Sequence, residues 1–106
     1  MDSAKYIETV SKYTSNVDTE LVEAIVKRLA PILGDADSSL VSCSDDTELD
    51  TVKKNFLSAK LGVEGEEADA AVKEVCEKMK EAHNKCRVTF YYLLVEKFDA
   101  KEKYVG

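Results

Sequence analysis

The sequence predicts an all-α fold, a compact bundle of about five helices, on three observations. Apolar residues recur every three or four positions along most of the chain, which is the spacing of a buried helix face. Four glycines and one proline are too few for the tight turns of a β-sandwich. Alanine, leucine, glutamate and lysine, which favour helices, are plentiful. With 106 residues, the chain suffices for one helical domain, residues 1–106.

Two helices are predicted in the first third of the chain, over residues 3–15 and 19–33. Their apolar stripes consist of Tyr6, Val10 and Tyr13 in the first helix and Val22, Ile25, Leu29 and Ile32 in the second. Asp18 is a suitable N-cap for the second helix, because its carboxylate can accept from free N–H groups of the first turn. Pro31 lacks an N–H and crowds the carbonyl four residues earlier, so the helix either kinks there or stops at Ala30.

A third helix is predicted over residues 45–61, after a long polar loop. Ser44 is the expected N-cap, and the acidic residues after it place negative charge at the positive end of the helix dipole. Gly62 is the expected left-handed residue that ends the helix, with Val63 folding back onto its last turn. The predicted buried stripe consists of Leu49, Val52, Phe56 and Ala59.

A fourth helix is predicted over residues 66–83, with Ala68, Val72, Val75, Met79 and Ala82 as its apolar stripe. Two pairs of opposite charges lie four residues apart, Asp69 with Lys73 and Glu74 with Lys78. Residues at this spacing are neighbours on a helix surface, so we expect each pair to stabilise the helix slightly.

The most apolar stretch is CRVTFYYLLVEKF, residues 86–98. Its valine, threonine and aromatic residues favour a strand, but the chain offers no second strand to pair with it. Tyr91, Leu94, Val95 and Phe98 follow helical spacing instead. A helix that is apolar nearly all round belongs inside a bundle, so we predict a buried central helix here.

The net charge and the hydropathy of the chain indicate which kinds of partner the protein does not bind. The net charge of −6 opposes binding to nucleic acid, and no apolar run is long enough to cross a membrane. The N-terminal stretch MDSAKYIETV lacks the apolar core of a secretory signal. We therefore expect a cytoplasmic protein that binds neither nucleic acid nor membranes.

The sequence assigns no catalytic, cofactor-binding or metal-binding residue. The three cysteines, Cys43, Cys76 and Cys86, are expected to be free thiols, because an odd and sparse set is typical of a reducing compartment. Cys43 lies near a helix start, where a thiolate is stabilised. His83 and Cys86 are zinc-ligand types, but two side chains do not make a metal site. The chain has no phosphate-binding glycine loop, paired CxxC or HExxH motif, so no cofactor is expected.

Three stretches in a fixed order, LVSCSDDTELDTVKKNFLSAKLG, the alanine-rich residues 66–83 and NKCRVTFYYLLVEKF, resemble a family of small bacterial proteins known as domain of unknown function 2853. The resemblance covers nearly the whole chain and implies a compact helical protein of the bacterial cytoplasm. It implies no activity. In this sequence Cys86 stands before Arg87, where the family pattern has an aromatic residue.

These observations favour a small non-enzymatic helical module that binds a protein partner or a second copy of itself beside residues 86–98. The alternative is a thiol- or metal-dependent activity built on Cys43, or on His83 with Cys86. The sequence leaves open which cysteine, if any, is reactive.

Overall fold

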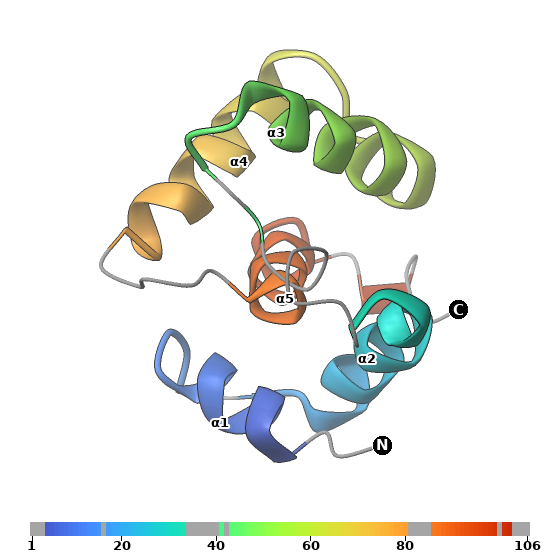
Figure 1. Cartoon of the computed structure of the whole chain (residues 1–106), viewed down its shortest axis with the longest axis vertical. Helices are drawn as coiled ribbons and strands as arrows, with labels where there is room; N and C mark the ends of the chain where they lie inside the picture. The colour runs from blue at the N-terminus through green and yellow to red at the C-terminus, as the bar shows by residue number, and fades with distance from the viewer. Residues whose placement is uncertain are drawn as a thin grey trace.

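In a computed structural model, the described part of the chain forms five helical segments (Figure 1). The structure describes residues 4–15, 17–33, 41, 43–80, 86–99 and 101–102. In chain order the helices are α1 (Ala4–Ser11), α2 (Thr19–Leu33), α3 (Asp46–Val52), which continues as the π-helix η1 (Lys53–Leu61), α4 (Glu66–Lys78) and α5 (Arg87–Lys97). No strand occurs within these described ranges, so the predicted all-α fold is confirmed.

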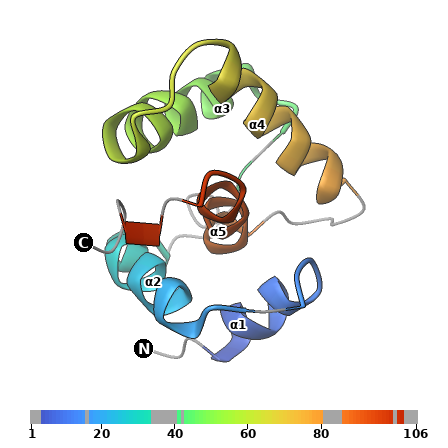
Figure 2. The ribbon, with the colours of Figure 1, turned by 180° about the vertical axis from the view of Figure 1, so that it is seen from behind.

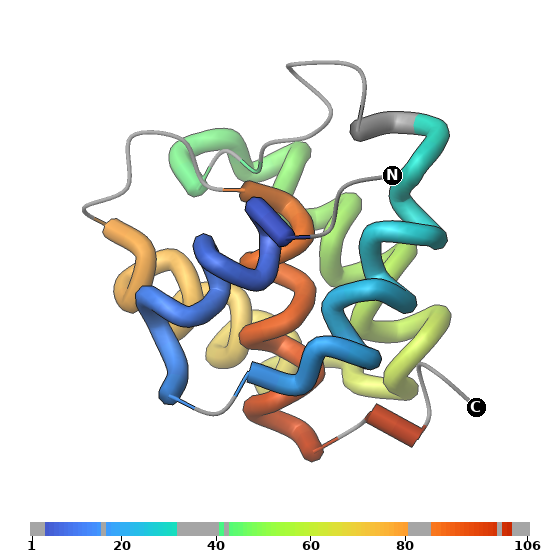
Figure 3. Tube along the Cα trace, turned by 90° about the horizontal axis from the view of Figure 1, so that it is seen from below, coloured from blue at the N-terminus to red at the C-terminus, as the bar shows by residue number. Residues whose placement is uncertain are grey.

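The last helix, α5, is the centre of the molecule. Figures 1 and 2, which view the molecule from opposite sides, show α5 between the α1–α2 layer and the α3–η1–α4 layer. All its residues from Arg87 to Val95 are buried, and α1, α2 and α4 pack against it. The tube in Figure 3 follows this central course from a third direction. The prediction of a buried central helix is confirmed.

Because α5 is covered on every side, its two adjacent tyrosines are both buried. Tyr91 and Tyr92 point in directions about 100° apart on a helix, and the cover over Arg87 to Val95 extends to both. Both are buried, with 7% and 2% of their surface exposed. The Tyr92 hydroxyl accepts a hydrogen bond of 2.8 Å from the backbone N–H of Asp18, which ties α5 to the start of α2.

α1 and α2 were both predicted, and only α1 differs in length from its prediction. α1 ends at Ser11, because a tight turn follows in which the Tyr13 N–H donates to the Val10 carbonyl at 2.9 Å. Asp18 caps α2 as predicted, accepting from the Leu21 N–H at 3.2 Å. α2 runs through Pro31 to Leu33, so the helix does not stop at Ala30.

The N-cap of α3 is Asp45, one residue after the predicted Ser44. Asp45 has the extended backbone that an N-cap requires, and its carboxylate accepts from the N–H groups of Thr47 at 3.0 Å and Glu48 at 3.3 Å. A carboxylate at this position also favours the positive end of the helix dipole.

The second half of this helix is wider than the predicted α-helix. Over η1 the backbone bonds span five residues rather than four, which brings Phe56 and Leu61, five apart, onto one face. Both are buried, together with Leu57, whereas Ala59, which we predicted to be buried, is exposed. Gly62 ends η1 as predicted, with a φ of 69°.

The fourth helix ends at Lys78, earlier than the predicted residue 83. Its apolar stripe is buried as expected at Ala68, Val72, Val75 and Met79, while Ala82 lies outside the described residues. The two predicted charge pairs within α4 are wrong. The carboxylates of Asp69 and Glu74 turn instead to lysines of neighbouring elements, Lys53 of η1 and Lys97 of α5. These pairs therefore join elements instead of stabilising one helix.

Candidate functional site

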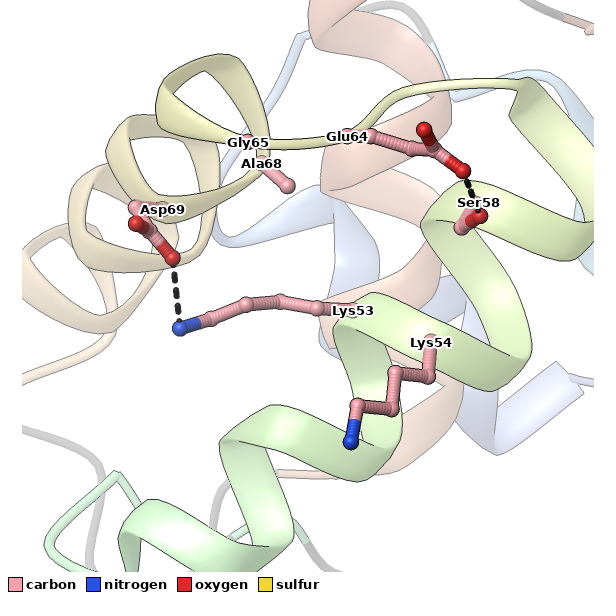
Figure 4. A pocket seen from close by; sticks show the side chains of 7 residues that line it. All are labelled: Lys53, Lys54, Ser58, Glu64, Gly65, Ala68 and Asp69. Carbon is pink, nitrogen blue, oxygen red and sulfur yellow. Dashed lines mark hydrogen bonds and ion pairs between the residues drawn. The ribbon is translucent and has the colours of Figure 1, made fainter.

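A pocket of about 270 Å³ lies between η1 and the start of α4 (Figure 4). η1 contributes Lys53, Lys54 and Ser58, and the turn into α4 and its first residues contribute Glu64, Gly65, Ala68 and Asp69. η1 and α4 both pack into the core, since Phe56 and Leu57 of η1 and Ala68 of α4 are core residues. The polar side chains of the two helices are thereby left to line the pocket.

Two charged groups of this pocket, Lys53 and Asp69, pair with each other, and a third, Glu64, bonds to Ser58. Figure 4 shows the Lys53 side chain reaching across to Asp69, with Nζ 2.7 Å from the carboxylate, and Glu64 turning back to Ser58, whose hydroxyl donates at 2.5 Å. The hydrogen bond to Asp69 raises the pKa of Lys53 above its ordinary value, although burial acts in the opposite direction. These contacts fasten η1 to α4.

A second hollow lies directly beside α5, on the side covered by α4. It has a volume of about 170 Å³ and is lined by Glu74, Val75 and Lys78 of α4 and by Leu93, Glu96 and Lys97 of α5. It shares Glu74 and Lys78 with a wider depression on the outer face of α4, which adds Ala70, Lys73 and Glu77. We call the two hollows together the α4–α5 face.

The α4–α5 face carries both signs of charge in equal number. Its charged residues are Lys73, Lys78, Lys97, Glu74, Glu77 and Glu96. The ion pair between Lys97 and Glu74 crosses from α5 to α4 and links the two halves of the face. Val75 and Leu93 are only 3% exposed each, so the apolar floor is largely covered by these charged side chains.

A buried arginine forms a third cluster, at the start of α5. Arg87 is 7% exposed and lies against the Tyr91 hydroxyl at 3.1 Å and the carboxylate of Glu48 from α3. Burial alone would lower the pKa of Arg87, but the hydrogen bonds to Tyr91 and Glu48 outweigh it and raise the pKa. Tyr91 in turn stacks on Phe56 with ring centroids 4.0 Å apart. This cluster joins α3, η1 and α5, and the sequence analysis missed it.

The prediction that all three cysteines are free thiols is wrong. Cys43 and Cys76 form a disulfide, with Cα atoms 5.9 Å apart, and Cys86 is free and partly exposed. The fold brings Cys43, in the turn before α3, next to Cys76 on α4, which no local sequence signal shows. A disulfide sulfur is no thiolate, so a reactive Cys43 thiol is excluded in this oxidised form.

The histidine of the alternative hypothesis, His83, lies outside the described residues, so its pairing with Cys86 stays a prediction. Within the part of the chain that is described, no group of three or more histidine, cysteine or acidic side chains could hold a metal ion. In that same part, no helix has the length and apolarity needed to span a bilayer.

The described part of the chain defines a helical domain built around a buried central helix. A family model described as "protein of unknown function (DUF2853)" matches residues 5–102. The chain belongs to this family, which confirms the resemblance seen in the sequence. Comparison with curated proteins finds no match.

Proposed function

We propose that this protein is a small non-enzymatic interaction module whose α4–α5 face binds a second copy of the chain. The observation behind the proposal is the charge balance of that face. It carries three lysines and three glutamates, whereas the whole chain has a net charge of −6. Two copies that meet on a neutral face bring opposite charges together and keep the like charges of the remaining surface apart.

The geometry of the face fits association better than catalysis. The hollow beside α5 has only about 170 Å³, and the wider depression on the outer face of α4, about 640 Å³, is open and lined by that one helix. The outer side of α4 is a helical surface on which Ala70 leaves room for close approach. Exposed charge pairs contribute little each, about 0–1 kcal/mol, so we expect a weak dimer that salt dissociates.

Sedimentation velocity over a range of protein concentrations tests this proposal. We expect the weight-average mass to rise with concentration at low salt and to return toward the monomer at about 0.5 M salt, where charges are strongly screened. Lys78→Glu, in both hollows of the face, should weaken the dimer. Lys12→Glu makes the same charge change in the exposed turn after α1 and should leave the dimer intact. A monomer at every concentration and salt, or equal weakening by both variants, would contradict the proposal.

We also propose the bacterial cytoplasm as the setting, with neither nucleic acid nor membranes as partners. The support is the resemblance described above and the net charge of −6, which disfavours polyanionic surfaces. Cell fractionation with an antibody to the protein tests the location. Recovery in the membrane or periplasmic fraction would contradict it.

A further inference from the structure

We propose that the Cys43–Cys76 disulfide is a redox-sensitive clamp that fastens α3 to the rest of the molecule. The bond joins residues 33 apart in sequence, from the turn before α3 to the last turn of α4. This inference concerns a different part of the molecule from the α4–α5 face and does not depend on dimer formation.

α3 has few other attachments. Among the described helices, only η1, its own continuation, packs closely along it. α3 is short, Asp46–Val52, and Val52 is its one fully buried residue. Its side-chain link to the central helix is the ion pair between Glu48 and Arg87. Beyond its continuation into η1, the disulfide and this ion pair are therefore the cross-links that hold α3 in place.

The clamp is accessible to a reductant. Cys43 and Cys76 are both partly exposed, and both lie at the margin of the core. In a reducing compartment, disulfides are usually transient and redox-sensing, whereas in an oxidising one they persist as structural bonds. A partly exposed disulfide next to α3, the described helix with the fewest attachments, is suited to the redox-sensing role.

The reaction is thiol–disulfide exchange with a dithiol reductant. A thiolate of the reductant attacks one sulfur of the Cys43–Cys76 bond, which breaks and leaves a mixed disulfide and one cysteine thiolate. The second thiol of the reductant then displaces the other cysteine, so the reductant leaves as a disulfide. Two electrons and two protons pass to Cys43 and Cys76, and the protein gains two thiols. A disulfide-bearing oxidant reverses the exchange.

Opening the clamp should loosen α3 more than the core. A cross-link of this span restricts the unfolded chain substantially, so we expect reduction to lower the Tm by roughly 10–20 °C. Amide hydrogen exchange should speed up more in α3 than in α2, widening the difference in protection between them by about tenfold or more. Arg87 would then lose its fixed carboxylate partner, because Glu48 moves with α3.

The experiment begins with a thiol count on protein purified without reductant and equilibrated with oxidised glutathione. Alkylation in denaturant followed by mass spectrometry should label Cys86 alone, and labelling after treatment with dithiothreitol should add Cys43 and Cys76. Three labelled cysteines before reduction would overturn the proposal.

Melting and hydrogen exchange are then measured with and without dithiothreitol on the wild type and two variants. Cys86→Ser keeps the clamp and should respond to the reductant as the wild type does. Cys43→Ser lacks the clamp and should match the reduced wild type in both conditions. An unchanged Tm and unchanged α3 exchange on reduction of the wild type would overturn the proposal, even if Cys43→Ser does not fold.

Discussion

Arg87 shows how a single charged residue is accommodated in an apolar core. It stands in the most apolar stretch of the sequence, and its guanidinium is satisfied by Tyr91 and by Glu48 from α3. Glu48 remains partly exposed, with 27% of its side chain accessible, while the Arg87 side chain is only 8% accessible. Removal of the carboxylate therefore takes one charged partner from a buried charge, which costs more than loss of a surface pair.

We predict that Glu48→Gln lowers the free energy of unfolding by about 1–3 kcal/mol, because Arg87 keeps its charge and loses the carboxylate of Glu48. The double variant Glu48→Leu with Arg87→Met should be less destabilised than Glu48→Gln, since no buried charge remains. Urea unfolding measures both. The matched control is Glu77→Gln, which removes a carboxylate from an exposed pair with Lys80 and should change stability little. Equal losses in Glu48→Gln and Glu77→Gln would contradict the assigned role.

The ion pair between Asp18 and Lys101 predicts a pH dependence. Lys101 Nζ lies 2.7 Å from the Asp18 carboxylate, and this hydrogen bond lowers the pKa of Asp18 below its ordinary value of 3.8. A lowered pKa in the folded state means that the stabilisation is present above the unfolded pKa and is lost as the pH falls through the folded pKa.

We therefore expect Lys101→Met to be less stable than the wild type at pH 5–8, and the difference to close below about pH 4. Lys101→Met leaves Asp18 free to cap α2, so the comparison removes only the ion pairs of Lys101, with Asp18 and with Glu20 at 3.6 Å. Thermal unfolding at a series of pH values measures the difference. A gap that is the same at pH 3 and pH 7 would show that the Asp18 carboxylate does not supply it.

At the scale of the elements, the turn between η1 and α4 depends on two glycines with different backbones. Gly62 has φ 69° and ψ 23°, in the left-handed region that other residues enter at a cost of about 1–2 kcal/mol. Gly65 has φ 66° and ψ −138°, close to a region that is almost restricted to glycine. A Cβ at either position meets no atom within 4 Å, so the backbone alone decides the cost.

Both Gly62→Ala and Gly65→Ala should destabilise the protein, and Gly65→Ala should do so more strongly. The reason is that alanine tolerates the left-handed conformation of Gly62 better than the backbone of Gly65. Chemical denaturation of the two variants under one set of conditions gives the order. A larger loss for Gly62→Ala would mean that the turn is held differently from the structure described here.

Sequence reasoning succeeded where local signals decide an element. Asp18 before an apolar stripe and Gly62 after one mark helix ends through hydrogen bonds within a few residues, and both were predicted. The width of η1 was not predicted, because the choice between an α- and a π-helix depends on how Phe56 and Leu61 meet the core. The cap at Asp45 was misplaced by one residue, since Ser44 and Asp45 are both good caps by type.

The candidate sites were harder to predict than the fold, since they join residues that are distant in the chain. Glu48 and Arg87 are 39 residues apart, and Cys43 and Cys76 are 33 apart. A lone arginine inside an apolar run was a signal that a buried partner exists, although not which one. The expectation of free thiols rested on cysteine count, which carries no information about distances in space.

At the scale of the whole molecule, the structure is organised around one helix whose neighbours cover it on all sides. α1 and α2 lie on one side of α5, and η1 and α4 on the other, so the core is continuous through the centre (Figures 1 and 2). The disulfide, the Arg87 cluster and the α4–α5 face all lie in the layer of α3, η1 and α4 or at its contact with α5. The α1–α2 layer contributes packing and the Asp18–Lys101 pair.

Residue-resolved hydrogen exchange of the oxidised protein tests this organisation most directly. The amides from Phe90 to Val95 belong to the buried centre and should exchange only through global unfolding, as the slowest set in the molecule. Amides of α1, Ala4–Ser11, where Val10 is the one buried residue, should exchange faster through local opening. Exchange in α5 as fast as in α1 would contradict a fold built around a central helix.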